Sequence, residues 1–306
     1  MSVMRAIQMT ARTDTTTRGW LPFDRWIVGY CALMVVVLTL FGESVAGSQW
    51  NIAIYVGCIV GIAMVVKWLP QEQSRVSMAI RLLYPALLLT PFYRMTGDYM
   101  FLLFDRFLDS HLVQLERAIL GVNPTLYIDR HLLNVWANEI IHMCYSSYYL
   151  MIPGFFLSMF MLRRNDIIVS AWTATMITFI ASYSLFILYP IEGPRWHFAE
   201  MYQNTIEGPI FRQFTETVMT HGAVRGGGMP SSHSGVAVVL LMYLLRHYRR
   251  AGLIAIFPVA GLAVGCVWGR FHYVSDVVVG IAIAVVSTVV VWRIIGGRYT
   301  ETRGDR

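Results

Sequence analysis

Charged side chains are scarce in this chain. Only 14% of its 306 residues are Asp, Glu, Lys or Arg, whereas 56% are hydrophobic. A soluble domain of this length carries about a quarter charged residues. The deficit argues against an ordinary soluble domain, and the long apolar runs indicate helices that cross a bilayer. We therefore predict an all-α, polytopic transmembrane helix bundle.

Cysteine is scarce as well, and neither internal repeats nor low-complexity tracts are visible. The four cysteines, at positions 31, 58, 144 and 266, lie within or at the edge of apolar segments. Such positions are typical of small core residues rather than of disulfides or metal ligands. We expect no disulfide framework, no cysteine-based metal site and no cofactor.

The net charge of +6 raises the question of a nucleic-acid partner. The basic residues, however, cluster at the ends of apolar runs, as the positive-inside pattern requires, so we expect no nucleic acid. The first apolar run starts near Trp26 behind a polar tail, and no small-residue cleavage site follows it. We therefore expect this run to be a retained membrane span rather than a signal peptide.

Eight apolar runs are candidate spans. Several are shorter than the ~20 residues that a bilayer requires, so their boundaries are soft. They are Trp26–Phe41, Trp50–Leu69, Ile80–Met95, Asn138–Leu162, Ile167–Tyr189, His233–Leu245, Leu253–Trp268 and Val274–Ile295.

Lys and Arg in the short loops predict the orientation. With eight spans, the polar tail 1–25, the loops 67–81, 163–166 and 246–250 and the C-terminal tail all fall on one side, while the loop 42–49 has no basic residue. The basic side is predicted to be cytoplasmic, with both termini there. We expect an integral protein of a bacterial inner membrane; a Golgi-type lumenal site is the alternative.

Two long segments then lie on the outer side. Residues 96–137 contain FDRFLDSHLVQLERAILG, in which apolar residues recur at helical spacing between charges. This pattern predicts an amphipathic helix lying in the membrane interface. The other segment, 190–230, is polar and punctuated by glycine.

Three short stretches place chemically active residues on this outer face. Polar and ionisable residues at membrane depth are costly and usually functional. Each stretch touches the outer end of a predicted span: YPIEGPRW (189–196), GGGMPSSHSG (226–235) and GRFHYVSD (269–276).

His272 and Asp276 are four residues apart, which places them on one face of a helix. A carboxylate there can accept the imidazole N–H, which fixes the tautomer and leaves the other nitrogen with a free lone pair. Such a ring is a candidate nucleophile or base. The alternative is a buried pair that only ties a helix end.

The stretch GGGMPSSHSG combines a helix start with flexible backbone. Pro230 stops a preceding helix, Ser231 or Ser232 can cap the next one, and His233 then lies in its first turn. Glycines such as Gly228 let amides turn toward one point, so the stretch predicts an oxyanion site with a proton-donating ring. The alternative is a glycine hinge with a capping serine.

Arg195 and Arg270 are candidate phosphate clamps, because guanidinium presents forked donors. Arg195 could equally be an interfacial anchor beside Trp196. Glu139 and His142, at the outer end of the fourth span, could hold a reacting alcohol or form a satisfied interhelical pair.

PSSH followed by HYVSD resembles the type 2 phosphatidic acid phosphatase superfamily. Its second motif, P-S-G-H, is matched by residues 230–233 with Ser for Gly, and the His and Asp of its third motif match His272 and Asp276. The Ser-Arg pair of the third motif falls on Gly265 and Cys266, so its arginine is missing and Arg270 is the candidate replacement. The first motif is absent.

Other stretches resemble the inositol phosphorylceramide synthase branch of that superfamily. YPIEGPRW is similar to its tyrosine-proline-to-arginine stretch, and the similarity as a whole covers roughly residues 98 to 285. Further matching positions are Glu116, the run Gly121 to Pro124, Glu139, His142 and Tyr145.

The resemblance implies a metal-independent transfer through a phosphohistidine. His272 would attack phosphorus, Asp276 would orient it and His233 would protonate the leaving alkoxide, with Arg195, Arg270, Ser231, Ser232 and Gly228 holding the phosphate. The substrate would be a phospholipid or lipid-linked phosphate, with water or a second alcohol as acceptor.

We expect about eight spans with a six-helix catalytic core. The expected divisions are a tail (1–25), three N-terminal spans (26–97), the catalytic domain (98–296) and a second tail (297–306). Two other functions stay open: a metalloenzyme in which His233, His272 and Asp276 bind iron or zinc, and a transporter with broken helices.

Overall fold

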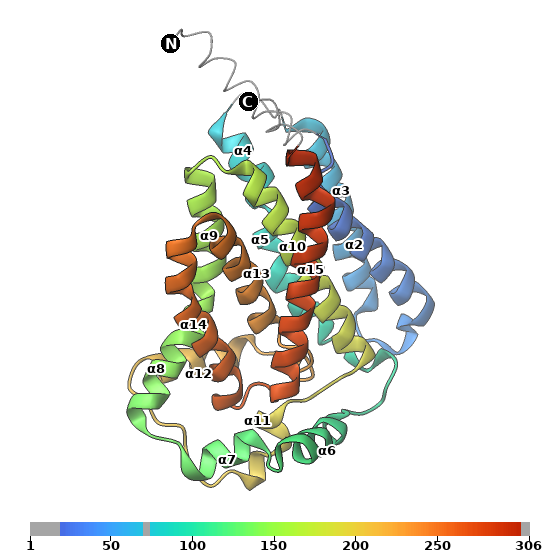
Figure 1. Cartoon of the computed structure of the whole chain (residues 1–306). Helices are drawn as coiled ribbons and strands as arrows, with labels where there is room; N and C mark the ends of the chain where they lie inside the picture. The colour runs from blue at the N-terminus through green and yellow to red at the C-terminus, as the bar shows by residue number, and fades with distance from the viewer. Residues whose placement is uncertain (1–18, 70–73, 301–306) are drawn as a thin grey trace.

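The computed structural model describes residues 19–69 and 74–300 of the chain, and in this part it is all-helical (Figure 1). The only extended pairing among these residues is an isolated parallel bridge between Ile191 and Gly227. The predicted all-α membrane bundle is confirmed. The N-terminal tail and the end of the C-terminal tail lie outside the described residues.

Seven helical stretches of the described chain are long and apolar enough to cross a membrane. Two of them combine consecutive helices, α4 (Arg75–Leu83) with α5 (Pro85–Thr96), and α8 (Val135–Ser146) with α9 (Tyr148–Met161). The other five are α2 (Pro22–Phe41), α3 (Ser48–Trp68), α10 (Asn165–Leu188), α14 (Arg249–Trp268) and α15 (Val274–Thr300), of which Val274–Ile295 is the span.

The expected span at His233–Leu245 forms α13 (Ser232–His247), which has 16 residues. At ~1.5 Å per residue it is about 24 Å long, shorter than the ~30 Å hydrocarbon core. Its first half is buried within the bundle, where it packs against α10, α14 and α15. A short helix suffices here because its surroundings are mostly protein rather than lipid.

The break between α4 and α5 follows from a proline. Pro85 has no amide hydrogen and cannot continue the hydrogen-bond ladder of α4, so a second helix starts at this residue. Pro91, Pro153 and Pro258 lie inside helices without ending them. The predicted span Ile80–Met95 therefore exists as two helices.

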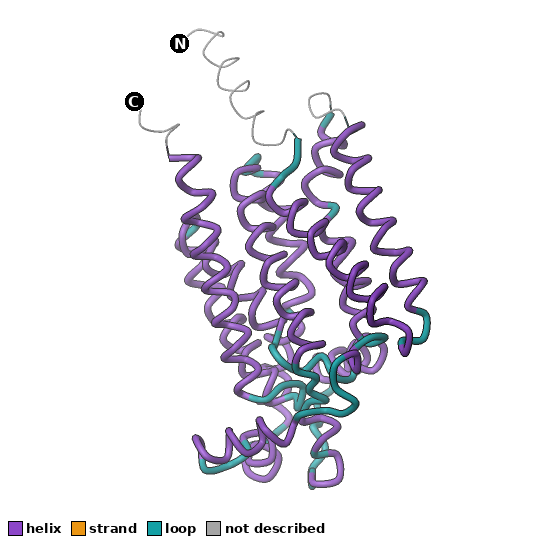
Figure 2. Tube along the Cα trace, turned by 90° about the vertical axis from the view of Figure 1, so that its right-hand side faces the viewer, coloured by secondary structure: helices purple, strands orange, loops and turns teal. Residues whose placement is uncertain are grey.

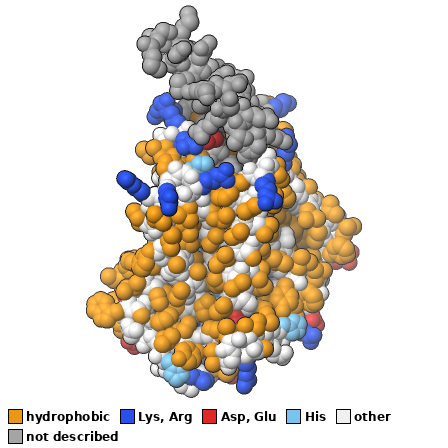
Figure 3. Space-filling view, viewed as in Figure 1, with side chains coloured by type: hydrophobic (Ala, Val, Ile, Leu, Met, Phe, Trp, Pro, Cys, Tyr) orange, Lys and Arg blue, Asp and Glu red, His pale blue; other side chains and the backbone are white. Residues whose placement is uncertain are grey.

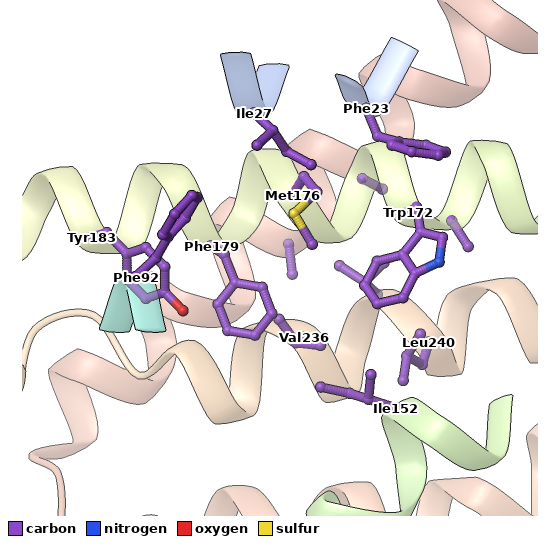
Figure 4. Close-up of a cluster of buried hydrophobic side chains, with 14 of the residues drawn as sticks. Phe23, Ile27, Phe92, Ile152, Trp172, Met176, Phe179, Tyr183, Val236 and Leu240 are labelled. Carbon is purple, nitrogen blue, oxygen red and sulfur yellow. The ribbon is translucent and has the colours of Figure 1, made fainter. Parts of the chain in front are cut away.

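Helix α10 is the centre of the hydrophobic core. Two-thirds of its membrane window is buried, and side chains from α2, α5, α9 and α13 meet it from several sides (Figure 4). Trp172 of α10 is fully buried and stacks on Phe156 of α9, with ring centroids 3.7 Å apart and planes 6° apart. This packing ties the N-terminal helices and the C-terminal helices into one core.

Polar contacts join the N-terminal helices to the bundle. The Arg81 guanidinium forms an ion pair with Asp24, and both side chains are almost fully buried. The Tyr84 hydroxyl donates to the same carboxylate. Farther along the helices, the hydroxyls of Tyr55 and Tyr99 are hydrogen-bonded to each other.

Helices that do not span the bundle gather at one of its ends (Figures 1 and 2). They are α6 (Asp109–Leu120), α7 (Pro124–His131), α11 (Pro194–His197) and α12 (Phe211–Gly222), with the 3-10 turns Met100–Leu102 and Ala199–Met201. We call this end the motif end. The expected amphipathic helix in 96–137 is divided into α6 and α7, because Gly121 ends α6 with a left-handed φ of 75°.

The opposite end holds the start of α2, the end of α15 and the basic loops between spans. Lys and Arg side chains form a belt near this end in the space-filling view (Figure 3), above a surface that is mostly hydrophobic. Apolar helices with this surface make the chain an integral membrane protein. A further short 3-10 turn, Gly42–Ser44, links α2 and α3.

Candidate active site

Backbone hydrogen bonds join the three polar stretches at the motif end. The amide of Ile191 donates to Gly226 O (3.3 Å), and the amide of Gly228 donates to Ile191 O (3.0 Å). The amide of Ser231 donates to Asp276 O (2.9 Å). The stretches 189–196, 226–235 and 269–276, far apart in sequence, therefore form one site.

His272 lies in the loop between α14 and α15, and its amide is fixed to Cys266 O (2.9 Å). The side chain is buried, and its Nδ1 lies 2.7 Å from Gly228 O. A carbonyl only accepts, so Nδ1 carries the proton and Nε2 is left with a lone pair in the neutral ring. This is the tautomer that a nucleophile at Nε2 needs.

Asp276 is fully buried in the first turn of α15, with its Oδ2 3.7 Å from Nδ1 of His272. That separation is longer than a hydrogen bond, because the N–H at Nδ1 donates to Gly228 O instead. Asp276 Oδ2 instead accepts from the amide of Tyr273 at 2.8 Å, and its Oδ1 has no hydrogen-bond partner. The carboxylate thus fixes the loop that carries His272 and lies beside the ring.

His233 is the second residue of α13, as predicted from the Pro-Ser-Ser start of the helix. Its ring centroid is 6.4 Å from that of His272. Tyr145 stacks on it at 5.8 Å, and Tyr148 contacts it at 4.3 Å. The two histidines and their tyrosine neighbours line the same cavity.

Ser231, Ser232 and Gly228 of the same stretch each have a different role in the structure. Ser231 is the N-cap of α13 and accepts from the amide of Ser234. Ser232 lines the cavity beside His233. The amide of Gly228 is already bonded to Ile191 O, so this residue offers its carbonyl to His272 rather than a free amide. A side chain at Gly228 would meet Ile191 O at 2.8 Å.

Arg195 lies in α11 and binds Glu216 of α12 through both terminal nitrogens. Arg212 binds the second oxygen of the same carboxylate at 2.6 Å. Burial raises the pKa of the Glu216 carboxyl, but the two guanidinium groups outweigh burial and hold this pKa below its usual range. One carboxylate is therefore shared by two arginines, which leaves a net positive charge on this cluster.

Arg270 has a left-handed φ of 65° and points to α7. Its guanidinium contacts Asp129 (2.5 Å) and Asn204 O (2.6 Å) and stacks over Tyr202. Neither Arg270 nor Arg195 is among the residues that line the cavity. The structure brings the two histidines, Ser232 and Gly228 together around this cavity, and holds the two arginines in ion pairs behind it.

The cavity has a volume of about 680 Å³ and two unlike ends. Glu192, Trp196, Ser232, His233 and His272 form its polar end at the motif end of the bundle. Apolar and aromatic side chains from α5, α9, α10 and α12 form the rest. A reacting group at the histidines would thus be continuous with an apolar compartment.

A family model of the PAP2 superfamily matches residues 110–290, more than half of the chain. This chain belongs to the PAP2 superfamily. No curated protein and no solved structure matches it. PAP2 proteins are phosphatases and phosphotransferases, and membership supports a lipid phosphatase-type function for this membrane protein. Both histidines and all three polar stretches lie within the matched residues.

Two carboxylates brace the candidate site: Asp109, which sequence reasoning missed, and Glu116, which it noted only as a position that resembles the family branch. Asp109 accepts from the amides of Glu192 (2.8 Å) and Gly193 (2.9 Å) and from the Tyr273 hydroxyl (3.0 Å). Glu116 accepts from the amide and hydroxyl of Ser275, both at 2.9 Å. Asp109 and Glu116 share one buried face of α6, because they are seven residues apart. The sequence signal that could have identified both residues is the presence of two acids on the apolar face of an amphipathic helix.

Glu139 has a similar role at α12. Its carboxylate accepts from the amides of Ile210, Phe211 and Arg212, at 2.9–3.3 Å. This arrangement caps the N-terminus of α12. His142 lies one turn further along α8 and bonds Asn138 O with Nδ1 at 2.7 Å. For Glu139, the structure shows the satisfied interhelical contact.

Asp109, Glu192 and His197 bring ligand atoms within 4.8 Å of one another, which is the spacing of a metal site. Both Asp109 oxygens already accept hydrogen bonds, and Glu192 is paired with Arg225. The carboxylates of Asp109 and Glu192 are thus already partnered within the protein. Among the described residues, His233, His272 and Asp276 do not form a cluster of this kind.

Proposed function

We propose that this PAP2 protein transfers a phosphoryl or phospho-headgroup from a lipid through a phosphohistidine on His272. The observation that carries the proposal is the pair of imidazoles facing one cavity, with the Nδ1 proton of His272 held by Gly228 O. A neutral imidazole with its Nε2 lone pair free is a nucleophile without further activation.

In the first step, the Nε2 lone pair of His272 attacks phosphorus and the bond from phosphorus to the lipid oxygen breaks. His233 donates a proton to the leaving alkoxide. Burial, and to a lesser degree His272, lower the pKa of the free His233 imidazole to about 3, so the ring takes up this proton only when the anionic phosphate is bound beside it. General acid catalysis of this kind contributes about 10²–10⁴-fold. Asp276, 3.7 Å from Nδ1, stabilises the positive charge that develops on the His272 ring.

In the second step, an acceptor oxygen attacks phosphorus, the bond from phosphorus to Nε2 of His272 breaks, and the proton of the acceptor passes to His233. Water as acceptor gives a phosphatase, and an alcohol gives a transferase of the inositol phosphorylceramide synthase kind. The apolar compartment beside the histidines supports a lipid substrate, because it would receive the part of the molecule next to the phosphate.

The phosphate oxygens would lie at the start of α13. The first amides of a helix have no intrahelical acceptor and attract anions, and Ser232 adds a hydroxyl at the cavity wall. We propose that Arg195 binds the phosphate. To do so, its guanidinium would leave Glu216 and pair with the phosphate oxygens instead. Arg270 is more firmly engaged, since Asp129, Asn204 and Tyr202 surround it.

We further propose that the motif end faces the extracytoplasmic side. The belt of Lys and Arg lies near the opposite end (Figure 3), and positive loops stay in the cytoplasm. The reaction would then use lipid from the outer leaflet, with a bacterial inner membrane as the proposed location.

The test is a search for the covalent intermediate. Purified protein is mixed with radiolabelled phosphatidic acid, quenched within the first turnover in alkali to preserve a phosphoramidate, and analysed by peptide mass spectrometry. We expect a phosphoryl adduct on the peptide that contains His272. Release of inorganic phosphate without added alcohol would indicate a phosphatase. Transfer of the label only to an added diacylglycerol or ceramide would indicate a transferase.

Variants complete this test. His272→Ala should remove both adduct and turnover, and His233→Ala should lower turnover by about 10²–10⁴-fold. His221→Ala is the matched control, because His221 is exposed on α12 and does not line the cavity. Turnover that persists in His272→Ala would contradict the proposal.

A further inference from the structure

The apolar part of the cavity is lined by three helical stripes that run in parallel from the histidines. On α4 and α5 the stripe extends from Leu83 to Tyr93, on α8 and α9 from Tyr145 to Leu157, and on α10 from Trp172 to Tyr183. In the first two stripes the lining residues recur three or four positions apart, and on α10 the lining residues Trp172, Phe179 and Tyr183 are seven and four positions apart. Each spacing returns to the same face of a helix.

The three stripes have nearly the same length. At ~1.5 Å per residue they extend roughly 15–18 Å along the bundle. This is about half of the ~30 Å hydrocarbon core of a bilayer. A cavity of this length would reach about the middle of a bilayer whose hydrocarbon surface lies at the histidines.

The stacked pair Phe156 and Trp172 closes the deep end. Both rings line the cavity, and both are almost fully buried in the core. Toward the side, Ala86 and Thr90 of α5 and Leu157 of α9 line the cavity and are also exposed on the surface of the bundle. The cavity is thus blocked at its floor and open to the lipid between α5 and α9.

We propose that this compartment, which we call the chain slot, binds one hydrocarbon chain of the lipid whose phosphate meets the histidines, and that Phe156 and Trp172 limit its length. The inference rests on the proposed function for the identity of the phosphate group. It adds a specificity element: one chain is withdrawn from the bilayer through the opening between α5 and α9. A volume of about 680 Å³ is that of a site for one compact ligand.

The chemistry of the lining fits a chain rather than a second headgroup. Below the histidines, the side chains that face the slot are aliphatic and aromatic, with tyrosines concentrated near the polar end. The Tyr183 hydroxyl donates to Leu89 O and Tyr93 accepts from the amide of Val224. These two hydroxyls are already engaged with backbone groups, and apart from Thr90 the lining beyond the tyrosines is apolar.

Binding of alkylphosphonates tests the slot without turnover. These phosphonates carry no cleavable ester bond, and their affinity is measured in nanodiscs for a series of unbranched chains, in the parent and in His272→Ala. Because a chain in the bilayer is already out of water, affinity is expressed per mole fraction of phosphonate in the nanodisc lipid, so that partitioning does not contribute. This affinity should stay level while the chain fits the slot and fall once the chain is longer than the slot. Affinity independent of chain length would overturn the proposal.

Two substitutions locate the chain. Ala86→Trp should fill the opening and reduce affinity for long chains at least tenfold more than for short ones, and Phe156→Leu should extend the level range to longer chains. Leu87→Trp is the matched control, because Leu87 is 76% exposed on the lipid-facing side of α5 and does not line the cavity. Equal effects of Ala86→Trp and Leu87→Trp would contradict the assignment.

The two proposals fail differently. If His272→Ala binds the phosphonates with the parent chain dependence but also keeps its turnover, the phosphohistidine is wrong and the slot stands. If His272→Ala is inactive and affinity ignores chain length, the slot is wrong and the reaction stands.

Discussion

Asp109 shows how a single buried carboxylate can set the shape of an active site. It holds the 192–193 turn through two amides and the Tyr273 hydroxyl through a third bond. Burial and the nearby Asp109 carboxylate both raise the pKa of the Tyr273 phenol, so it remains a donor across physiological pH. Tyr273 follows His272 directly, so Asp109 acts as a positioning residue.

Asp109→Asn tests this role. An amide group has one acceptor oxygen and two donors, so it cannot serve three donors, and leaving buried donors unmatched costs about 1–3 kcal/mol. We expect kcat to fall roughly 10- to 100-fold through misplacement of His272, with KM changed much less. Steady-state kinetics of Asp105→Asn, an exposed residue four positions earlier, should match the parent. An unchanged kcat in Asp109→Asn would contradict the assignment.

At the residue scale, the sequence predicted the nearness of His272 and Asp276 from their spacing, but not their contacts. The carboxylate was expected to accept the hydrogen bond from the His272 ring, but Gly228 O, 44 residues away, accepts it instead. Arg270 is likewise paired with Asp129, 141 residues away. Partners this distant depend on how loops fold against each other, which local patterns do not encode.

The close packing of α13 against α15 places His233 near His272. Gly235 and Gly280 let the two helices approach closely, since a Cβ at Gly280 would meet Ser231 O at 2.3 Å and one at Gly235 would meet Gly280 O at 2.9 Å. Ser231 is two residues before His233. The separation of the two helices therefore sets the distance between the rings of His233 and His272.

Gly280→Ala should separate these helices. Overpacking against backbone costs about 1–3 kcal/mol, and the displaced Ser231 should lower kcat as well. Gly57→Ala in α3 is the control, because nothing lies within 4 Å of a Cβ there, and helix propensity should make it neutral or slightly stabilising. Thermal unfolding and kcat measured together check both parts; a Gly280→Ala protein with parent values would show that the contact relaxes freely.

Hydrophobic runs predicted the elements well, because burial in a bilayer demands them. Their interruptions were less visible: Pro85 divides one predicted span, and Gly121 divides the amphipathic segment into α6 and α7. Both residues are recognisable helix breakers in hindsight. Whether a proline ends a helix, as Pro85 does, or lies within it, as Pro153 does, depends on tertiary packing.

At the scale of the molecule, the buried Asp24 and Arg81 pair joins α2 to α4, and through α2 to the central α10. From the sequence, Arg81 was assigned to a basic loop as a topology signal, whereas Asp24 was not singled out and the pairing was not predicted. Removing one partner of a buried pair leaves an uncompensated charge.

Arg81→Met should therefore destabilise the whole bundle by about 3–5 kcal/mol. The measurement is the unfolding midpoint in detergent, compared with Arg75→Met, an exposed arginine in the same helix. Equal midpoints for the two variants would show that Asp24 finds another partner, for example Tyr84 alone.

The histidines and the start of α2 lie at opposite ends of the bundle, and this determines which lipid can reach the proposed reaction. Only lipid already resident in the leaflet at the motif end can reach the histidines, and the lipid product stays in that leaflet while the released water-soluble group diffuses away on the same side. A lipid phosphate synthesised on the other face would first have to be flipped across the bilayer. The rate at which the lipid phosphate crosses the bilayer, rather than the reaction at the histidines, would then limit the supply of substrate.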